Sequence, residues 1–280
     1  MKLKKISINL LFSLALFLFL LIVVDAVLFI VMPPAYTIEE YGWQVRPNYT
    51  DVMNREDSPG EFRDIQNNYF KHGFKRWGDL ENEKTKVLVL GDSITQATQV
   101  NNGEEWYAYL EASFPEAEFF VYGGNGYGTT QEYLILDSYF DEINPDIIIW
   151  QFTDNDFPNN LFAADKAGYP GNNLSYRPYL EDGEIVYRLP MLASGIREYS
   201  RTIDYYLREY EKNWPKDKLI SKVMNSLLGV SLEKPFMHFI SQKNLKESYS
   251  VTVELFELID ARVSPRPVFL FSAFDELTAI

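Results

Sequence analysis

The sequence predicts an α/β domain with a parallel sheet, preceded by one N-terminal transmembrane helix. Three short apolar runs, at 86–90, 118–122 and 146–152, are typical of buried strands, and helical patterns lie between them. Strands that alternate with helices at this spacing indicate βαβ units, in which the strands are parallel. A long apolar run close to the N-terminus predicts the membrane helix.

The remaining elements follow in chain order. Helical patterns occupy the segments 103–113, 130–142, 194–214, 216–229 and 247–262. A last strand is expected at 267–272. Turn signals at Pro170-Gly171 and Asp182-Gly183 interrupt the alternation, and we expect 157–245 to be an insertion or cap within one domain. The chain thus divides into 1–34, a lead-in segment at 35–84 that is expected to be irregular, and an α/β domain at 85–280.

The N-terminal run has the features of a membrane anchor. Residues 6–32 are long enough for a helix to cross a hydrocarbon core of about 30 Å. Lysines precede the run, and no Lys or Arg follows it until Arg46, which predicts a cytoplasmic N-terminus and an extracytoplasmic remainder. A cleaved signal peptide is the alternative. Its apolar region is usually shorter, and no small-x-small cleavage site precedes Pro33-Pro34, so we expect an uncleaved single-pass anchor.

Composition excludes several classes of function. The formal net charge of −14 argues against nucleic acid or an anionic lipid surface as the main partner. The chain has no cysteine, which excludes disulfides, Cys-ligated metals and a thiol nucleophile. Its two histidines, His72 and His238, are far apart and lack metal-ligand spacing, so a His-rich metal site is not expected.

Polar residues and glycines follow each of the three predicted strands. Gly91-Asp92-Ser93 follows the first, a glycine cluster at 123–128 follows the second, and Thr153-Asp154-Asn155-Asp156 follows the third. Because the carboxyl ends of parallel strands share one edge, where ligands bind, these segments should converge. A serine hydroxyl can attack an ester carbonyl, while glycine N–H groups and an asparagine amide can donate to the oxyanion. Taken singly, a tight turn and a helix cap would also explain the glycines and Asn155.

The same three segments resemble a known family. Val87–Thr95, which includes Gly91-Asp92-Ser93, resembles the first sequence block of the SGNH/GDSL hydrolases, also described as GDSL-like lipases or acylhydrolases. Gly126–Gln131 resembles the second block and Asn155-Asp156 the third, in family order, and the likeness runs from about 86 to 160.

The resemblance implies a three-layer α/β/α, flavodoxin-like domain that needs no metal or organic cofactor. Ser93 would be the nucleophile and would also donate its backbone N–H to the oxyanion. Gly126 would be the second donor, with Gly128 as the other register, and Asn155 would donate through its side chain. Thr153 stands where many relatives have glycine.

One family feature is missing from the sequence. Relatives carry a fourth block, Asp-x-x-His, whose histidine deprotonates the serine. No Asp-x-x-His occurs in this chain, and Asp275 is followed by Thr278 where the histidine would stand. Truncation of a longer enzyme is the simplest explanation. The alternatives are a non-catalytic relative that only binds, or a base at His238 or His72, which we interpret as a packed and a surface residue, respectively.

These observations predict an extracytoplasmic serine ester hydrolase with an acyl-Ser93 intermediate. Its partners would be a small-molecule or polysaccharide ester, such as acyl groups of envelope polysaccharide or lipid, and the membrane through the N-terminal helix. Acyl transfer to a polysaccharide hydroxyl and a non-catalytic binding protein are the alternatives. A nucleotide site is disfavoured, since 124–128 does not match G-x-G-x-x-G and no Walker-type lysine follows.

Overall fold

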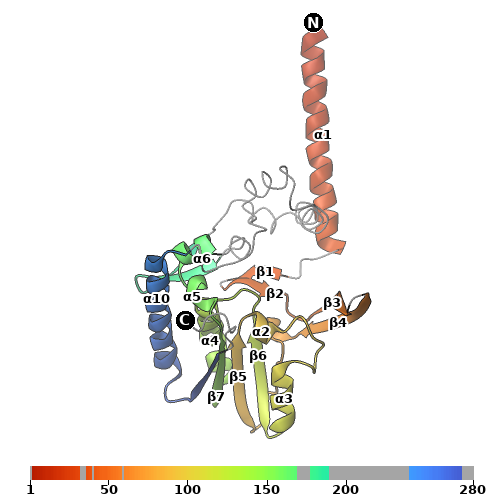
Figure 1. The fold of residues 1–280 in the computed structure, drawn as a ribbon. Coiled ribbons are helices and arrows are strands. Elements are labelled where there is room, and N and C mark those ends of the chain that lie inside the picture. Colours follow the sequence, from red (N-terminus) through yellow and green to blue (C-terminus); the bar gives the residue numbers. More distant parts are fainter. Residues whose placement is uncertain are drawn as a thin grey trace.

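The computed structural model describes residues 2–31, 36–39, 41–58, 60–168, 177–188 and 240–272. Helix α1 (Lys2–Val31) projects away from the rest of the described chain (Figure 1). Within it, Leu10–Leu28 is long and apolar enough to cross a membrane, and none of this stretch is buried. A membrane anchor or a signal sequence has these properties.

A parallel four-stranded sheet forms the centre of the described structure. Its strands, in the spatial order β10-β7-β5-β6, are β10 (Val268–Ser272), β7 (Ile147–Phe152), β5 (Thr85–Gly91) and β6 (Ala117–Gly123). Every neighbouring pair is parallel, which confirms the α/β class that the apolar runs predict. The chain enters the sheet at β5, and the next two strands lie on opposite sides of it.

Both faces of the sheet are covered by helices. Leu88 and Leu90 of β5 join a core that includes residues of α4 (Thr129–Ile143) and α10 (Gln242–Val263). The alternate side chains, Val87 and Val89, pack on the other face with residues of α3 (Trp106–Ser113). Burial on two faces is the reason that the strand reads as a continuous apolar run. Helix α10 begins at Gln242, before the predicted 247. The prediction missed this start because the first turns are polar and carry no apolar periodicity.

The lead-in segment differs from the prediction. Where the sequence predicts irregular structure, the described residues form antiparallel hairpins. Their strands are β1 (Tyr36–Glu39), β2 (Gly42–Val45), β3 (Tyr49–Ser58) and β4 (Glu61–Tyr69), followed by the 3₁₀ turn η1 (Lys71–Gly73). Most of β3 and the first half of β4 are exposed on both faces, so their sequences show no apolar alternation. For this reason a search for apolar patterns did not predict these polar, charged strands.

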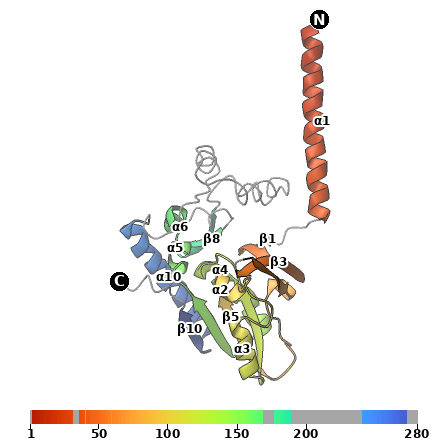
Figure 2. The same ribbon diagram turned by 45° about the vertical axis from the view of Figure 1, so that its right-hand side comes forward.

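The part of the insertion that the structure describes lies beyond β7. It comprises the helices α5 (Asp156–Asn159) and α6 (Phe162–Gly168) and a hairpin of β8 (Arg177–Glu181) with β9 (Glu184–Arg188). The predicted turn at Asp182-Gly183 is confirmed, with φ of 52° and 78°. The turn expected at Pro170-Gly171 and the helices expected at 194–214 and 216–229 lie outside the described residues. In Figures 1 and 2, α5 and α6 lie at the same end of the sheet as the short helix α2 (Ser93–Gln96).

Candidate active site

Ser93 begins α2 directly after β5, at the carboxyl edge of the sheet. Its side chain is exposed, whereas Asp92 before it is buried and caps the helix by accepting a 2.9 Å hydrogen bond from the Ile94 N–H. The turn requires glycine at 91, because a Cβ there would lie 2.4 Å from Gln151 Oε1 and from Thr95 Oγ1. The chain thereby presents the Ser93 hydroxyl to solvent on a tightly packed turn.

The neighbouring strand β7 holds this turn in place. Gln151 Oε1 accepts a hydrogen bond of 3.2 Å from the Asp92 N–H and one of 2.9 Å from Thr95 Oγ1. Gln151 is buried, so both bonds are shielded from water. The first and third polar segments of the sequence are therefore fixed relative to each other at the junction of β5 and β7.

The side chains after β7 continue this network to Ser93. Asp92 Oδ2 lies 3.5 Å from Ser93 Oγ and 3.0 Å from Thr153 Oγ1. Thr153 Oγ1 in turn lies 2.5 Å from Asn155 Oδ1. The structure thus brings Ser93 and Asn155 into one polar chain, in the sequence Ser93, Asp92, Thr153, Asn155. The bridging Thr153 was recognised in the sequence only as a departure from the family pattern.

The glycine turn after β6 approaches α2 through its first residues. Gly124 N–H donates a 3.1 Å hydrogen bond to the Gly91 carbonyl. A Cβ on Gly123 would lie 2.1 Å from the backbone nitrogen of Gln96, so only glycine lets α2 pack this closely. Gly126 has a φ of 73°, and its carbonyl accepts from Arg177. Among the described residues, no hydrogen bond joins Gly126 to Ser93.

Arg177 is a residue at this edge that the sequence did not indicate. It comes from β8, is buried, and donates to the carbonyls of Gly126 and Asn159, the latter at 3.4 Å. Its Nε lies 3.6 Å from Asp165 Oδ2, and its guanidinium lies 4.9 Å from the Trp43 ring centroid. Arg177 therefore connects the insertion, the lead-in segment and the glycine turn. No spacing rule relates residues so distant in the chain.

Two further carboxyl groups lie beneath the site, on Glu132 and Asp156. Burial raises the pKa of both well above the ordinary range, and the charge of Asp92 raises each further. Asp156 Oδ2 accepts a 2.7 Å hydrogen bond from the Thr153 N–H, and Glu132 Oε2 accepts one of 2.5 Å from Trp150 Nε1. We therefore expect both groups to retain protons to higher pH than exposed carboxyls do. The described residues contain no group of His, Asp and Glu suited to a metal ion.

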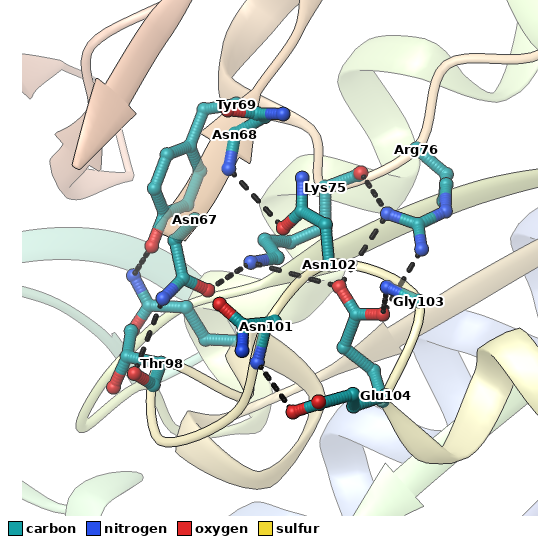
Figure 3. A network of polar contacts seen from close by, with 12 residues as sticks. Asn67, Asn68, Tyr69, Lys75, Arg76, Thr98, Asn101, Asn102, Gly103 and Glu104 are labelled. Atoms are coloured by element: carbon teal, nitrogen blue, oxygen red, sulfur yellow. Dashed lines mark hydrogen bonds and ion pairs between the residues drawn. The ribbon is translucent and has the colours of Figure 1, made fainter. Parts of the chain in front are cut away.

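The lead-in segment holds the loop after α2 through a buried polar network (Figure 3). Gln96 Nε2 donates to the Tyr69 hydroxyl at 3.2 Å, and Asn67 Nδ2 donates to the Thr98 carbonyl at 3.1 Å. Gln96 lies on α2, three residues after Ser93. The hairpin β3–β4 thus contacts the end of α2 and the loop after it, whereas Gln151 of β7 contacts the turn that begins α2.

His72 makes no contact with Ser93 among the residues that the structure describes. His72 packs against the rings of Trp77 and Tyr139, at centroid distances of 5.1 Å and 4.7 Å, and is only partly exposed. Burial lowers its pKa. It contacts the last turns of α4, which runs back from the carboxyl edge that carries Ser93. His72, interpreted from the sequence as a surface residue, is thus partly exposed and also packs on these two rings, while His238 and Asp275 lie outside the described residues.

No protein-family model matches the chain, and no curated protein is significantly similar to it. The residues at the carboxyl edge of the sheet therefore provide the basis for a function. They offer an exposed serine hydroxyl, a buried carboxyl group beside it, and an asparagine amide connected to that carboxyl group through a threonine hydroxyl.

Proposed function

We propose that this protein is a serine ester hydrolase of the SGNH/GDSL family that forms an acyl-Ser93 intermediate. The observation that carries this proposal is the polar chain from Ser93 through Asp92 and Thr153 to Asn155. The strand order supports it. Numbered along the chain, the sheet reads 2-1-3-4, as in flavodoxin-like folds, whose ligands bind at the switch point between the first and third strands. Ser93 and Asn155 follow those two strands.

The reaction is an acyl transfer in two steps. Ser93 Oγ attacks the ester carbonyl carbon, and the bond from that carbon to the alcohol oxygen breaks as the alcohol leaves with a proton. Water then attacks the acyl-enzyme, releasing the carboxylic acid and restoring the Ser93 hydroxyl. Backbone N–H groups of Ser93 and Gly126 and the side-chain amide of Asn155 would stabilise the oxyanion in both steps.

Proton transfer from Ser93 depends on an acceptor near its hydroxyl. Among the described residues, Asp92 Oδ2, at 3.5 Å, is the acceptor that the structure presents to Ser93 Oγ. The lack of a histidine contact in this part of the chain favours one alternative, a protein that binds esters without turning them over. Hydrolysis of a model ester, with a Ser93→Ala control, distinguishes turnover from binding alone.

The N-terminal helix suggests where the reaction takes place. The lysines at the start of α1, ahead of its apolar stretch, favour a cytoplasmic N-terminus, which would place the α/β domain outside the membrane. Esters of envelope polysaccharides or lipids are the substrates such a position offers. A sugar hydroxyl in place of water would convert the same intermediate into a transferase product.

Hydrolysis of p-nitrophenyl acetate by the detergent-solubilised full chain tests the proposal. Wild type should release nitrophenol with an acetyl group detectable on Ser93 by mass spectrometry, and Ser93→Ala should do neither. Ser113→Ala is the matched control, because Ser113 is exposed at the end of α3 and bonds only to the Tyr109 carbonyl in the described structure. Equal rates for wild type and Ser93→Ala would contradict catalysis by this serine.

A further inference from the structure

Thr153 occupies a restricted position between two acceptors. Its side chain is buried, with 4% exposed, and its backbone N–H is fixed by a 2.7 Å hydrogen bond to Asp156 Oδ2. Its hydroxyl carries one proton but lies 2.5 Å from Asn155 Oδ1 and 3.0 Å from Asp92 Oδ2. The contact with Asn155 Oδ1 is the shorter of the two, which favours Asn155 as the acceptor of that proton.

This contact determines which end of the Asn155 amide faces the substrate. The terminal torsion of asparagine is broad, so an unrestrained side chain samples orientations that exchange its oxygen and nitrogen. An oxygen directed toward a developing oxyanion would repel it, whereas the two N–H groups of Nδ2 would stabilise it. With Oδ1 bound to the Thr153 hydroxyl, the amide nitrogen Nδ2 faces away from Thr153 and can donate to the oxyanion.

We propose that Thr153 is a positioning residue, whose hydroxyl holds Asn155 Oδ1 so that Nδ2 is presented to the oxyanion. This inference rests on the proposed function, since it requires an oxyanion to be stabilised. Thr153 does not touch the reacting atoms and acts through Asn155. Valine, which has the same shape without the hydroxyl, should remove the effect, while serine should preserve it.

A double-mutant cycle measures this dependence. The proteins are wild type, Thr153→Val, Asn155→Ala and the double variant, with p-nitrophenyl acetate as the ester. Asn155→Ala should lower kcat about 10²–10³-fold, as the loss of one oxyanion donor does elsewhere. Thr153→Val should lower kcat about tenfold with KM nearly unchanged, because the interaction is made in the transition state. In the Asn155→Ala background, Thr153→Val should have no further effect.

Thr153→Ser tests whether activity depends on the hydroxyl. Serine keeps the hydroxyl but lacks the methyl group, so a purely structural role of Thr153 would not predict that it restores kcat. Thr153→Ser should keep kcat within about twofold of wild type, with circular dichroism confirming that every variant is folded. The inference is overturned if Thr153→Val lowers kcat by the same factor with and without Asn155, which would assign the hydroxyl to Asp92. It is also overturned if the serine variant is as impaired as valine, or if valine has wild-type activity.

The two levels of the proposal fail in different ways. If wild type and Ser93→Ala are equally inactive, the proposed function is wrong and the positioning role falls with it. If Ser93→Ala alone is inactive while Thr153→Val matches wild type, the hydrolase stands and only the role of Thr153 is wrong.

Discussion

The Nζ atom of Lys75 lies 2.5 Å from Oδ1 of Asn67, and both side chains are fully buried (Figure 3). The ammonium also lies 4.0 Å from Glu105 Oε1 and 4.9 Å from the centroid of the Tyr69 ring. These partners only partly replace the water that a lysine loses on burial. Burial is the main reason that the pKa of Lys75 falls to about 8, against the raising effects of Glu105 and Asp51.

This lowered pKa predicts that stability increases with pH above about 8. In the unfolded chain Lys75 keeps its proton up to about pH 10.4, whereas in the folded chain it loses the proton near pH 8. Between these values the unfolded state binds more protons, so the free energy of unfolding rises with pH. We expect a rise of about 1 kcal/mol between pH 8 and pH 9 in urea unfolding of the full chain in detergent.

Lys75→Met is the control for that rise. Methionine fills a similar volume without a titratable group, so its unfolding free energy should lose the contribution of Lys75 between pH 8 and pH 9. The same slope in both proteins would assign the pH dependence to other groups.

Glu132 should affect stability in the opposite direction. Burial raises its pKa, so stability is full below about pH 4.5 and is lost as pH rises toward the folded-state value. Glu132→Gln removes this loss and still offers an oxygen to Trp150 Nε1. At pH 8 the variant should be more stable than wild type, and this difference should become smaller as the pH falls toward 4.5. Glu257→Gln, at an exposed position on α10, should change neither value appreciably.

Arg177 and Arg188 provide a matched pair on one hairpin. Arg177→Met leaves the buried Asp165 carboxyl group without this guanidinium and removes the donors to Gly126 and Asn159, which should cost about 3–5 kcal/mol. Arg188→Met breaks an exposed pair with Glu181 and should cost less than about 1 kcal/mol. Thermal unfolding of both variants measures the difference, and equal melting temperatures would contradict a structural role for Arg177.

The orientation of the chain in the membrane can be tested by single cysteines, because the natural sequence has none. A cysteine replacing exposed Ser113 should react with a membrane-impermeant maleimide in intact cells if the α/β domain lies outside. A cysteine replacing Lys2 should react only after permeabilisation. The reverse pattern would overturn the proposed orientation, and loss of the Lys2→Cys label from the mature protein would indicate a cleaved signal sequence.

The sequence predicted the sheet well because burial on two faces leaves a clear apolar signature. Strands such as β5 and β7 begin and end close to the predicted positions, and the polar segments after them meet as parallel strands require. The hairpin β3–β4 was missed because exposed strands carry no such signature. Arg177 was missed for another reason. Its contacts depend on how the insertion folds back onto the domain, and this cannot be predicted from the residues next to it in the chain.

The short segment after η1 has a consequence for where an autonomous folding unit can begin. Lys75 N–H donates to the Val121 carbonyl at 2.7 Å, and Arg76 forms an antiparallel bridge with Val121, so this segment shields the outer edge of β6. Phe74 beside it is part of the main core, and Tyr41, further toward the N-terminus, belongs to the same core. A recombinant fragment cut at the apparent start of the α/β pattern, near 85, would leave β6 as an open edge prone to self-association. A soluble fragment that retains the sheet should therefore start before Tyr41, even though the α/β pattern in the sequence begins more than forty residues later.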